Sequence, residues 1–374
     1  MADTTHKTSI LTSKEGLTVR LSTQVDDDIP IYMTGSFNSW NVADRRYQLK
    51  KTAPNEFQLD IPAGQALFYP LEYKFLRGGW DQVELDESGN LIDNRVLEKP
   101  ISEVKVYVPL WAKPEKHYDP ELLPKVVIIS NHFEIPQLIK TRRITALLPH
   151  DYYESEKHYP VLYLQDGQNL FDDYAPYGNW EVDKRLAELA GRGMGDIIIV
   201  AIDHGKEERL AEFTPSLTNT KFSKRDGKKY IRFLADTLKP HIDKNFRTLS
   251  DVHNTGIGGS SMGGLISIYA GLVYPEVYSR LMIFSPALWV MPDMYFGSIH
   301  LQQSFDTRIY LYAGGKESQN MVPNVKKFQK MVTDKSAGRS KIDFNLSIDP
   351  EGVHSEYHWG EAFPKALEWL FFRK

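Results

Sequence analysis

The stretch TGIGGSSMGGLISIYAGLVYPE, residues 255–276, indicates how the second half of this chain folds. It sets Ser261 between Gly259 and Gly263, with a further glycine at position 264. The segment TGIG before the serine predicts a strand, and the amphipathic run after it predicts a helix. A serine on the sharp turn between a strand and a helix can present its hydroxyl at the edge of a sheet. The bare pattern Gly-x-Ser-x-Gly is equally typical of a plain glycine-rich turn, so the rest of the chain must distinguish the two.

Apolar strand-like runs alternate with helical patterns from about residue 125 onward. These runs are PVLYLQDG (160–167), DIIIVAID (196–203), NTGIGG (254–259) and RIYLYAGG (308–315). Strands that are apolar along their length and separated by helices are typical of a parallel sheet covered on both faces. Residues 125–374 are therefore predicted to form an α/β domain with a mostly parallel sheet.

Residues 1–108 follow a different pattern. Short alternating runs such as GLTVRLST (16–23) and EFQLDIP (56–62) are separated by clusters of Gly, Pro, Asn and Asp. Strands at this spacing, without helical patterns, predict a small all-β sandwich. The stretch PLWAKPEKHYDPELLP, residues 109–124, contains four prolines and is predicted to be a semi-extended linker. A chain of 374 residues is also long enough for two domains.

The composition excludes several classes of function. Hydrophobic residues at 41% and charged residues at 25% are those of an ordinary globular protein. The net charge of −4 offers no basic surface to nucleic acid or to an anionic membrane, and no apolar run is long enough to span one. The absence of cysteine excludes disulfides, thiolate catalysis and cysteine-ligated metals. We expect no metal or organic cofactor, and the sequence leaves the oligomeric state open.

The first residues, MADTTHKTSILTSKEG, lack the charged-then-apolar pattern of a signal peptide. The sequence as given therefore predicts a cytoplasmic protein. A periplasmic or secreted protein is the alternative if a signal peptide has been removed, because a chain without cysteine suits either redox environment.

A serine hydroxyl needs a base to become a nucleophile, so the histidines after Ser261 are the next candidates. His354 is predicted to lie in a loop that follows the strand-like run KIDFNLSID and precedes the terminal helix. This is the place for the base when the chain order is Ser, then Asp or Glu, then His. His358 is predicted to lie within the helix and to face another way, and His300 has no strand leading to it.

An acidic residue after the preceding strand would orient that histidine. Glu317 lies two residues after the run RIYLYAGG, just past the predicted strand end, and is the preferred candidate. Asp349 is close to His354 in sequence and remains a competitor, whereas Asp343 is predicted to lie inside a strand, where its side chain is less free to reach the histidine. The pattern therefore predicts a Ser261–His354–Glu317 triad, with Asp349 as the alternative acid.

Two backbone N–H groups are needed to bind the oxyanion that forms when a serine attacks an ester. One is predicted to come from Met262, the residue after the nucleophile, and the other from Gln168, which follows the Asp166-Gly167 turn.

A zinc site involving His354, Glu356 and His358 is disfavoured. The zinc-protease pattern places two histidines on one helical face with glutamate directly after the first, and Ser355 occupies that position here.

Residues 140–374 resemble the "putative esterase" family of α/β-hydrolases, which includes siderophore esterases, feruloyl and acetyl-xylan esterases and S-formylglutathione hydrolase. The matching segments are ALLPHDYYESEKHYPVLYLQDGQNLFDD, RLAEFTP, GIGGSSMGGLISIYAGLVYPEVYSRLMIFSPALW and GVHSEYHWGEAFPKALEWLF. The resemblance implies an α/β-hydrolase fold, Ser261 as nucleophile and His354 as base. It further implies an acyl pocket lined by Arg209, Glu212 and Trp289, although core packing is an equal alternative for the tryptophan.

The N-terminal segments IYMTGSFNSWN and LEYKFLRGGWDQVELDESGNLIDNR are similar to immunoglobulin-like modules that bind glycogen and starch. In such modules two exposed tryptophans stack on glucose rings, because a flat aromatic face complements the C–H face of a pyranose. The resemblance implies that Trp40 and Trp80 take this role, with Lys74 and Asn94 beside them. An accessory domain that packs its tryptophans on a catalytic partner is the alternative.

The sequence thus predicts a serine carboxylic-ester hydrolase that acts on a siderophore-like ester or a feruloyl or acetyl ester of a carbohydrate. An acyltransferase that passes the same acyl group to a sugar is one alternative. A non-catalytic α-glucan-binding protein with an inert hydrolase domain is another.

Overall fold

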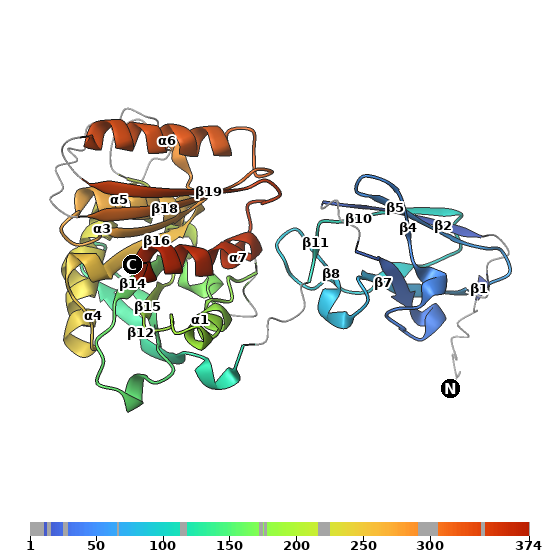
Figure 1. Cartoon of the computed structure of the whole chain (residues 1–374), viewed down its shortest axis with the longest axis horizontal. Coiled ribbons are helices and arrows are strands. Elements are labelled where there is room, and N and C mark those ends of the chain that lie inside the picture. The colour runs from blue at the N-terminus through green and yellow to red at the C-terminus, as the bar shows by residue number, and fades with distance from the viewer. Residues whose placement is uncertain are drawn as a thin grey trace, which may run out of the picture. The chain divides into compact units, whose positions relative to one another are not determined.

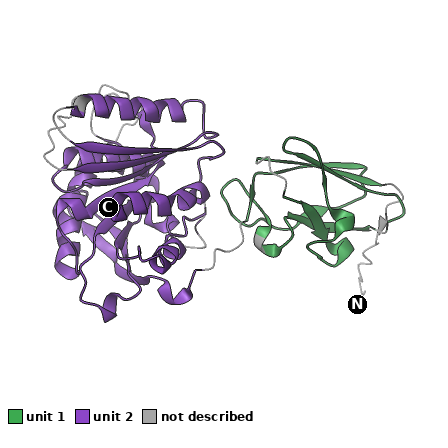
Figure 2. Ribbon diagram, viewed as in Figure 1, with its two compact units in different colours: residues 1–116 green, residues 117–374 purple. Residues whose placement is uncertain are grey.

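The structure is a computed structural model, drawn in Figure 1, and the chain forms two compact units, residues 1–116 and 117–374 (Figure 2). It describes residues 11–12, 16–24, 29–65, 67–112, 118–171, 175, 178–215, 225–290, 306–337 and 341–373. No helix in these residues is long and apolar enough to cross a membrane.

The first unit is all-β. One sheet has the strand order β10-β2-β5-β4 and a second has the order β3-β7-β9, while β1 pairs with β6 and β11 with β8. Alternate residues of both larger sheets enter one apolar core, which Leu21, Phe57, Met33 and Phe75 illustrate. The bounds are β1 (Leu11–Thr12), β2 (Leu17–Thr23), β3 (Tyr32–Gly35), β4 (Lys50–Ala53), β5 (Glu56–Ile61), β6 (Phe68–Tyr69), β7 (Leu71–Leu76), β8 (Glu84–Leu85), β9 (Arg95–Leu97), β10 (Glu103–Val108) and β11 (Leu110–Trp111).

The boundary between the units differs from the predicted linker at residues 109–124. Strand β11 pairs with β8, and Trp111 is only 7% exposed in the core of the first unit. At the other end of the predicted linker, Pro120–Leu122 form a short 3₁₀ helix, η4, in which Asp119 accepts a hydrogen bond from the N–H of Glu121 at 2.9 Å. Proline is compatible with a first helical position, so proline content alone overestimates the length of the linker.

The second unit is built on an eight-stranded sheet with the order β12-β13-β15-β14-β16-β17-β18-β19. Strands β14 to β19 are parallel to one another, and β12 and β13 are antiparallel additions at one edge. The bounds are β12 (Lys125–Ile135), β13 (Lys140–Leu148), β14 (Val161–Gln165), β15 (Ile198–Ile202), β16 (Thr255–Ser260), β17 (Arg280–Phe284), β18 (Thr307–Gly314) and β19 (Ile342–Asp349).

Helices cover both faces of this sheet, because the strands are buried on both sides and need apolar partners there. One core contains Leu265 of α5, Tyr230 of α3 and Phe328 of α6, and the other contains Leu186 of α1 and Phe363 of α7. The predicted α/β architecture is confirmed. The bounds are α1 (Val182–Gly191), α2 (Arg209–Glu212), α3 (Gly227–Phe233), the π-helical η8 (Leu234–Leu238), α4 (Lys239–Asn245), α5 (Ser261–Val273), α6 (Met321–Ser336), α7 (Glu356–Leu367) and the π-helical η12 (Glu368–Phe372).

The parallel strands end at the same edge of the sheet, which is where α/β proteins assemble their sites. Ser261 follows β16, Glu317 lies three residues beyond the end of β18, and His354 lies in the connection between β19 and α7. The fold therefore carries three residues that are far apart in sequence to one edge.

Candidate active site

Ser261 occupies a strained turn between β16 and α5. Its φ angle is 54°, in the left-handed region that side-chain-bearing residues rarely adopt. The glycines around it are required by space: a Cβ on Gly263 would lie 2.9 Å from Asp166 Oδ2, and one on Gly259 would lie 2.9 Å from the carbonyl carbon of Gly263. Helix and strand can therefore meet closely only with glycine at these positions. A serine in such a turn is held at the edge of the sheet.

His354 and Glu317 form an ion-pair-type contact across two strand ends. His354 Nδ1 lies 2.7 Å from Glu317 Oε2, with the glutamate side chain 1% exposed and the imidazole 36% exposed. The other carboxylate oxygen, Oε1, accepts hydrogen bonds from the Gly314 N–H at 2.7 Å and from the Ser285 hydroxyl at 2.6 Å. Because the carboxylate is fixed by these donors, the ring that it contacts is held in one orientation.

Trp359 supports the same pair from α7. Its indole N–H donates to Ser285 Oγ at 2.9 Å, and its ring meets the His354 ring edge-on with the centroids 4.8 Å apart. The Ser285 hydroxyl thus links the tryptophan to Glu317, because it accepts from the indole and donates to the carboxylate. Sequence reasoning missed both residues; the only signal is their position, just after β17 and five residues after the histidine.

The competing candidates are engaged elsewhere. Asp349 accepts from the N–H of Glu351 at 3.0 Å and lies 3.4 Å from the hydroxyl of Tyr312, while His358 is buried and its Nδ1 lies 3.0 Å from Ser355 Oγ. Asp343 lies within β19, and His300 lies outside the described residues. Within the described part of the chain, the histidine is therefore paired with Glu317.

Ser261 itself makes no hydrogen bond to His354 among the described residues. Catalytic hydrogen bonds are often long in the absence of substrate and tighten when it binds, so the position of Ser261 is compatible with a partner of this kind.

The two predicted oxyanion donors come from the ends of β16 and β14. Met262 is the second residue of α5, and the first backbone N–H groups of a helix have no acceptor within it. Gln168 lies in the short 3₁₀ helix η6 (Gly167–Asn169). Its side chain accepts from the His204 N–H at 2.9 Å and contacts the His204 carbonyl at 3.4 Å, which ties η6 to the end of β15.

Arg209, predicted to line the acyl pocket, pairs with Asp166 instead of standing free. Its Nε and Nη2 donate to the two carboxylate oxygens at 2.6 and 2.8 Å. Burial alone would lower the pKa of Arg209, but the hydrogen-bonded Asp166 raises it above its usual value. Since Asp166 also lies against Gly263, this pair packs beneath the turn that holds Ser261.

Glu212, also predicted to line the acyl pocket, lies in the interior of the second unit. Its side chain is fully buried and accepts from Arg142 at 2.6 and 2.7 Å and from Lys140 at 3.1 Å. The Glu212 carboxylate is thus engaged by two cationic side chains of strand β13. Trp289 is the opposite case: 60% exposed in the short helix η10 (Leu288–Val290), it is not a core residue.

A second carboxyl group lies at the site and was not predicted. Glu356 begins α7, and its Oε1 accepts a hydrogen bond from Asn169 Nδ2 at 3.2 Å. Burial and, more weakly, the negative charge of Asp166 raise the pKa of Glu356 to about 7, although its backbone N–H, His354 and Asn169 oppose the rise. A glutamate two residues after a candidate histidine was the available signal, but only the fold brings Asn169 to it.

The predicted carbohydrate-binding residues gather in the first unit. The rings of Trp40 and Trp80 lie 6.1 Å apart at 39°, and Trp80 is 51% exposed. Lys74 donates to the carbonyl of Ile92, and Asn94 donates to Glu72 at 3.0 Å. The two tryptophans are thus close together, with the lysine and asparagine engaged in bonds within the unit.

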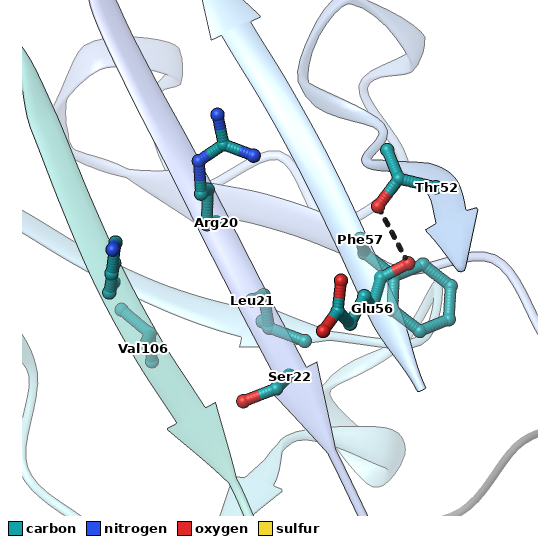
Figure 3. A pocket seen from close by; sticks show the side chains of 8 residues that line it. Arg20, Leu21, Ser22, Thr52, Glu56, Phe57 and Val106 are labelled. Carbon is teal, nitrogen blue, oxygen red and sulfur yellow. Dashed lines mark hydrogen bonds between the residues drawn. The ribbon is translucent and has the colours of Figure 1, made fainter. Parts of the chain in front are cut away.

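A separate hollow of about 230 Å³ lies on the sheet β10-β2-β5-β4 (Figure 3). Its lining does not include either tryptophan and consists of Arg20, Leu21, Ser22, Thr52, Glu56, Phe57, Lys105 and Val106. In the described residues, no group of three or more His, Cys, Asp or Glu side chains is placed to hold a metal ion.

Residues 136–370 match the family model described as "Putative esterase". A Bacillus subtilis protein named "Uncharacterized protein YbbA" is 27% identical over 62% of this chain and 92% of its own length. An "Endo-1,4-beta-xylanase/feruloyl esterase" of Xylanibacter ruminicola is 30% identical over 44% of this chain and 23% of its own length. An "Alpha-amylase" of Niallia circulans is 46% identical over 18% of this chain, but that segment spans only 5% of the amylase.

Among solved structures, the enterobactin esterase FES of Shigella flexneri matches with a TM-score of 0.53 and 17% identity, over 93% of this chain and 92% of its own. At that identity the likeness shows the fold. It extends over nearly the whole chain, and with the family match it assigns the second unit to the α/β-hydrolase fold, as predicted.

Proposed function

Because this chain belongs to the putative esterase family, we propose that it cleaves carboxylic esters through an acyl-enzyme formed on Ser261. His354 is the general base, Glu317 orients it, and the backbone N–H groups of Met262 and Gln168 bind the oxyanion. The observation that carries the proposal is the 2.7 Å contact between His354 Nδ1 and the buried Glu317 carboxylate.

The chemistry follows from that contact. A carboxylate at Nδ1 keeps the imidazole proton there, which leaves Nε2 as the acceptor for the serine proton. As Ser261 attacks the ester carbonyl, His354 takes its proton and becomes an imidazolium that Glu317 stabilises. His354 then returns the proton to the leaving alcohol. A water molecule, activated by the same base, releases the acyl group from Ser261.

The expected substrates are siderophore-like esters and feruloyl or acetyl esters of carbohydrates. The names of the Shigella enterobactin esterase and the Xylanibacter feruloyl esterase support these classes. Trp289 lies in the segment after β17 and Leu210 in the segment after β15, and their side chains are 60% and 45% exposed. Exposed apolar side chains in these segments favour an aromatic or otherwise apolar acyl group. Hydrolysis rates of a matched series of feruloyl, catecholoyl and acetyl esters test this preference, and faster cleavage of the acetyl ester would contradict it.

The first experiment is labelling with a fluorophosphonate, followed by intact mass and peptide mapping. We expect one adduct per chain, on Ser261, and none in Ser261→Ala. Ser260→Ala is the matched control, since Ser260 is the neighbouring residue and ends β16, and it should still be labelled. Full esterase activity in purified Ser261→Ala would overturn the proposal.

A second proposed function concerns the first unit, and the Trp40–Trp80 pair is the observation that favours it. Two tryptophans 6.1 Å apart, one half exposed, could stack on glucose rings of an α-glucan. Affinity electrophoresis in glycogen or amylose should retard the wild type and not the Trp40→Ala/Trp80→Ala double variant. Wild-type migration that glucan leaves unchanged would eliminate this function, and esterase activity should be the same in both proteins.

A further inference from the structure

Glu356 joins two parts of the candidate active site that are 187 residues apart in sequence. Its carboxyl group receives the Asn169 side-chain hydrogen bond at 3.2 Å. Asn169 ends η6 and directly follows Gln168, the candidate oxyanion donor. Glu356 in turn stands two residues after His354. One hydrogen bond thus connects the segment of the oxyanion donor with the segment of the base.

The connection is anchored on the η6 side. The Asn169 N–H donates to the Asp166 carbonyl at 2.9 Å, and the Asn169 carbonyl accepts from the Trp180 N–H at 2.9 Å. These two bonds hold the backbone of Asn169 in place. A partner that binds the Asn169 side-chain amide therefore also helps to fix η6. On the other side, Glu356 is the first residue of α7, whose Trp359 contacts the His354 ring.

The charged groups that act on Glu356 are Asp166, Arg209 and His354. Asp166 and Arg209 are paired with each other, so their charges partly cancel. His354 is the remaining cation when it is protonated. An ionised Glu356 would therefore place a negative charge next to the imidazolium that forms during the reaction, without touching the ring.

We propose that Glu356 is a positioning residue with two effects: its hydrogen bond to Asn169 holds Gln168 in register with His354, and its ionisation favours the imidazolium. The inference rests on the proposed function. Misplacement of an oxyanion donor by even a fraction of an ångström weakens its bond to the transition state more than to the bound ester. Loss of the link should therefore lower kcat and leave KM nearly unchanged.

Two substitutions separate the two effects. Glu356→Gln keeps a carbonyl acceptor for Asn169 and removes the ionisation, whereas Glu356→Leu removes both. With p-nitrophenyl acetate as substrate, Glu356→Leu should lower kcat about five- to tenfold at about pH 6, the size expected for one hydrogen bond, and by several-fold more at about pH 8.5, where the effect of the ionised carboxylate is lost as well. Glu356→Gln should match the wild type at about pH 6 and fall several-fold below it at about pH 8.5, where the wild-type carboxyl is ionised.

The controls make the outcome specific. Glu351→Gln removes an exposed carboxylate from the same connection and should leave the pH profile unchanged. At about pH 6, where the wild-type carboxyl is protonated, Asn169→Leu should reproduce the loss seen in Glu356→Leu, and the double variant should lose no more than either single one, because both break the same bond. This double-mutant cycle distinguishes the loss of one shared hydrogen bond from two independent packing defects.

The proposal is overturned if Glu356→Leu retains wild-type kcat, or if Glu356→Gln and the wild type have the same pH profile. If Glu356→Leu does not fold, the profile of Glu356→Gln remains sufficient to support or refute the effect of its ionisation, and Asn169→Leu tests the link. Failure of the proposed function gives a different result: Ser261→Ala would remain active, and the wild type would hydrolyse the ester without forming a fluorophosphonate adduct on Ser261.

Discussion

At the scale of single residues, the candidate site is held by groups whose polar atoms are almost all engaged. Glu317 contacts one ring nitrogen and two further donors, and Gln168 and Asn169 are each bonded to another segment. The sequence predicted Glu317 and His354 from their order and their places after strands. It did not predict Ser285, Trp359 or Asn169, because nothing local distinguishes a side chain that meets a candidate site residue only after folding.

Replacing Glu317 tests the proposed acid. Glu317→Gln should preserve the fold but present an amide to His354, so that the imidazole is no longer held with its proton at Nδ1. We expect kcat to fall by up to about 10⁴-fold, as for the equivalent change in other triads. Asp349→Asn is the matched control and should stay within about twofold of the wild type. A large loss in Asp349→Asn together with a small loss in Glu317→Gln would reverse the assignment.

The raised pKa of Glu356 has a consequence for stability. Its value of about 7 in the folded protein, against an ordinary 4.5, means that the folded chain keeps a proton that the unfolded chain has released. Stability from this group is therefore complete below about pH 4.5 and declines as the pH rises toward 7. Glutamine has no such proton to release, so the Tm of Glu356→Gln relative to that of the wild type should rise between about pH 5 and pH 8. Calorimetry that finds a constant difference would contradict the raised pKa.

At the scale of secondary-structure elements, the alternation of apolar runs and helical patterns predicted the sheet and its helices. The prediction succeeded for β14, β15, β16 and β18, because these strands are buried over nearly all of their length and leave short runs without exposed charge in the sequence. The linker was less well predicted. Leu110 and Trp111 lie in a proline-rich stretch yet form β11, since their pairing partner, β8, lies 25 residues earlier in the chain and has no local signature.

The close contact between β16 and α5 depends on glycine, and substitution of Gly263 tests this dependence. In Gly263→Ala the new methyl group would meet Asp166 and Gln165 at 2.9 and 3.0 Å, which should cost about 1–3 kcal/mol of unfolding free energy. Because the helix would move away from the strand, fluorophosphonate labelling should also slow. Gly191→Ala in α1 is the control, since its methyl group would lie 3.6 Å from Leu122. Urea denaturation of both variants measures the difference, and equal midpoints would refute the steric argument.

At the scale of the whole molecule, the two units each have their own apolar core. Every residue proposed for ester cleavage belongs to residues 117–374, and the family match at 136–370 lies within that unit. What the sequence could not supply at this scale is the substrate: Arg209 and Glu212, which resemble pocket residues by motif, are both engaged in internal ion pairs. Side-chain pairing of this kind depends on the complete fold.

The second unit should therefore cleave esters alone. A protein that begins at His117 should fold cooperatively and hydrolyse p-nitrophenyl acetate with a kcat within about threefold of the full chain, because domains with separate cores can fold independently. Loss of α-glucan retardation should accompany the deletion if the first unit binds glucan. An aggregated or inactive product would show that the first unit is required for the fold or the site.

The left-handed turn at Ser261 also bears on how such a sequence is maintained over generations. Glycine adopts that backbone conformation without the penalty of roughly 1–2 kcal/mol that a side chain incurs. Mutation toward a more stable protein would therefore favour glycine at this position and erase the hydroxyl. If Ser261 is the proposed nucleophile, the chemistry of its hydroxyl outweighs this gain in stability, and a chain that no longer needed the reaction would be expected to replace the serine with glycine.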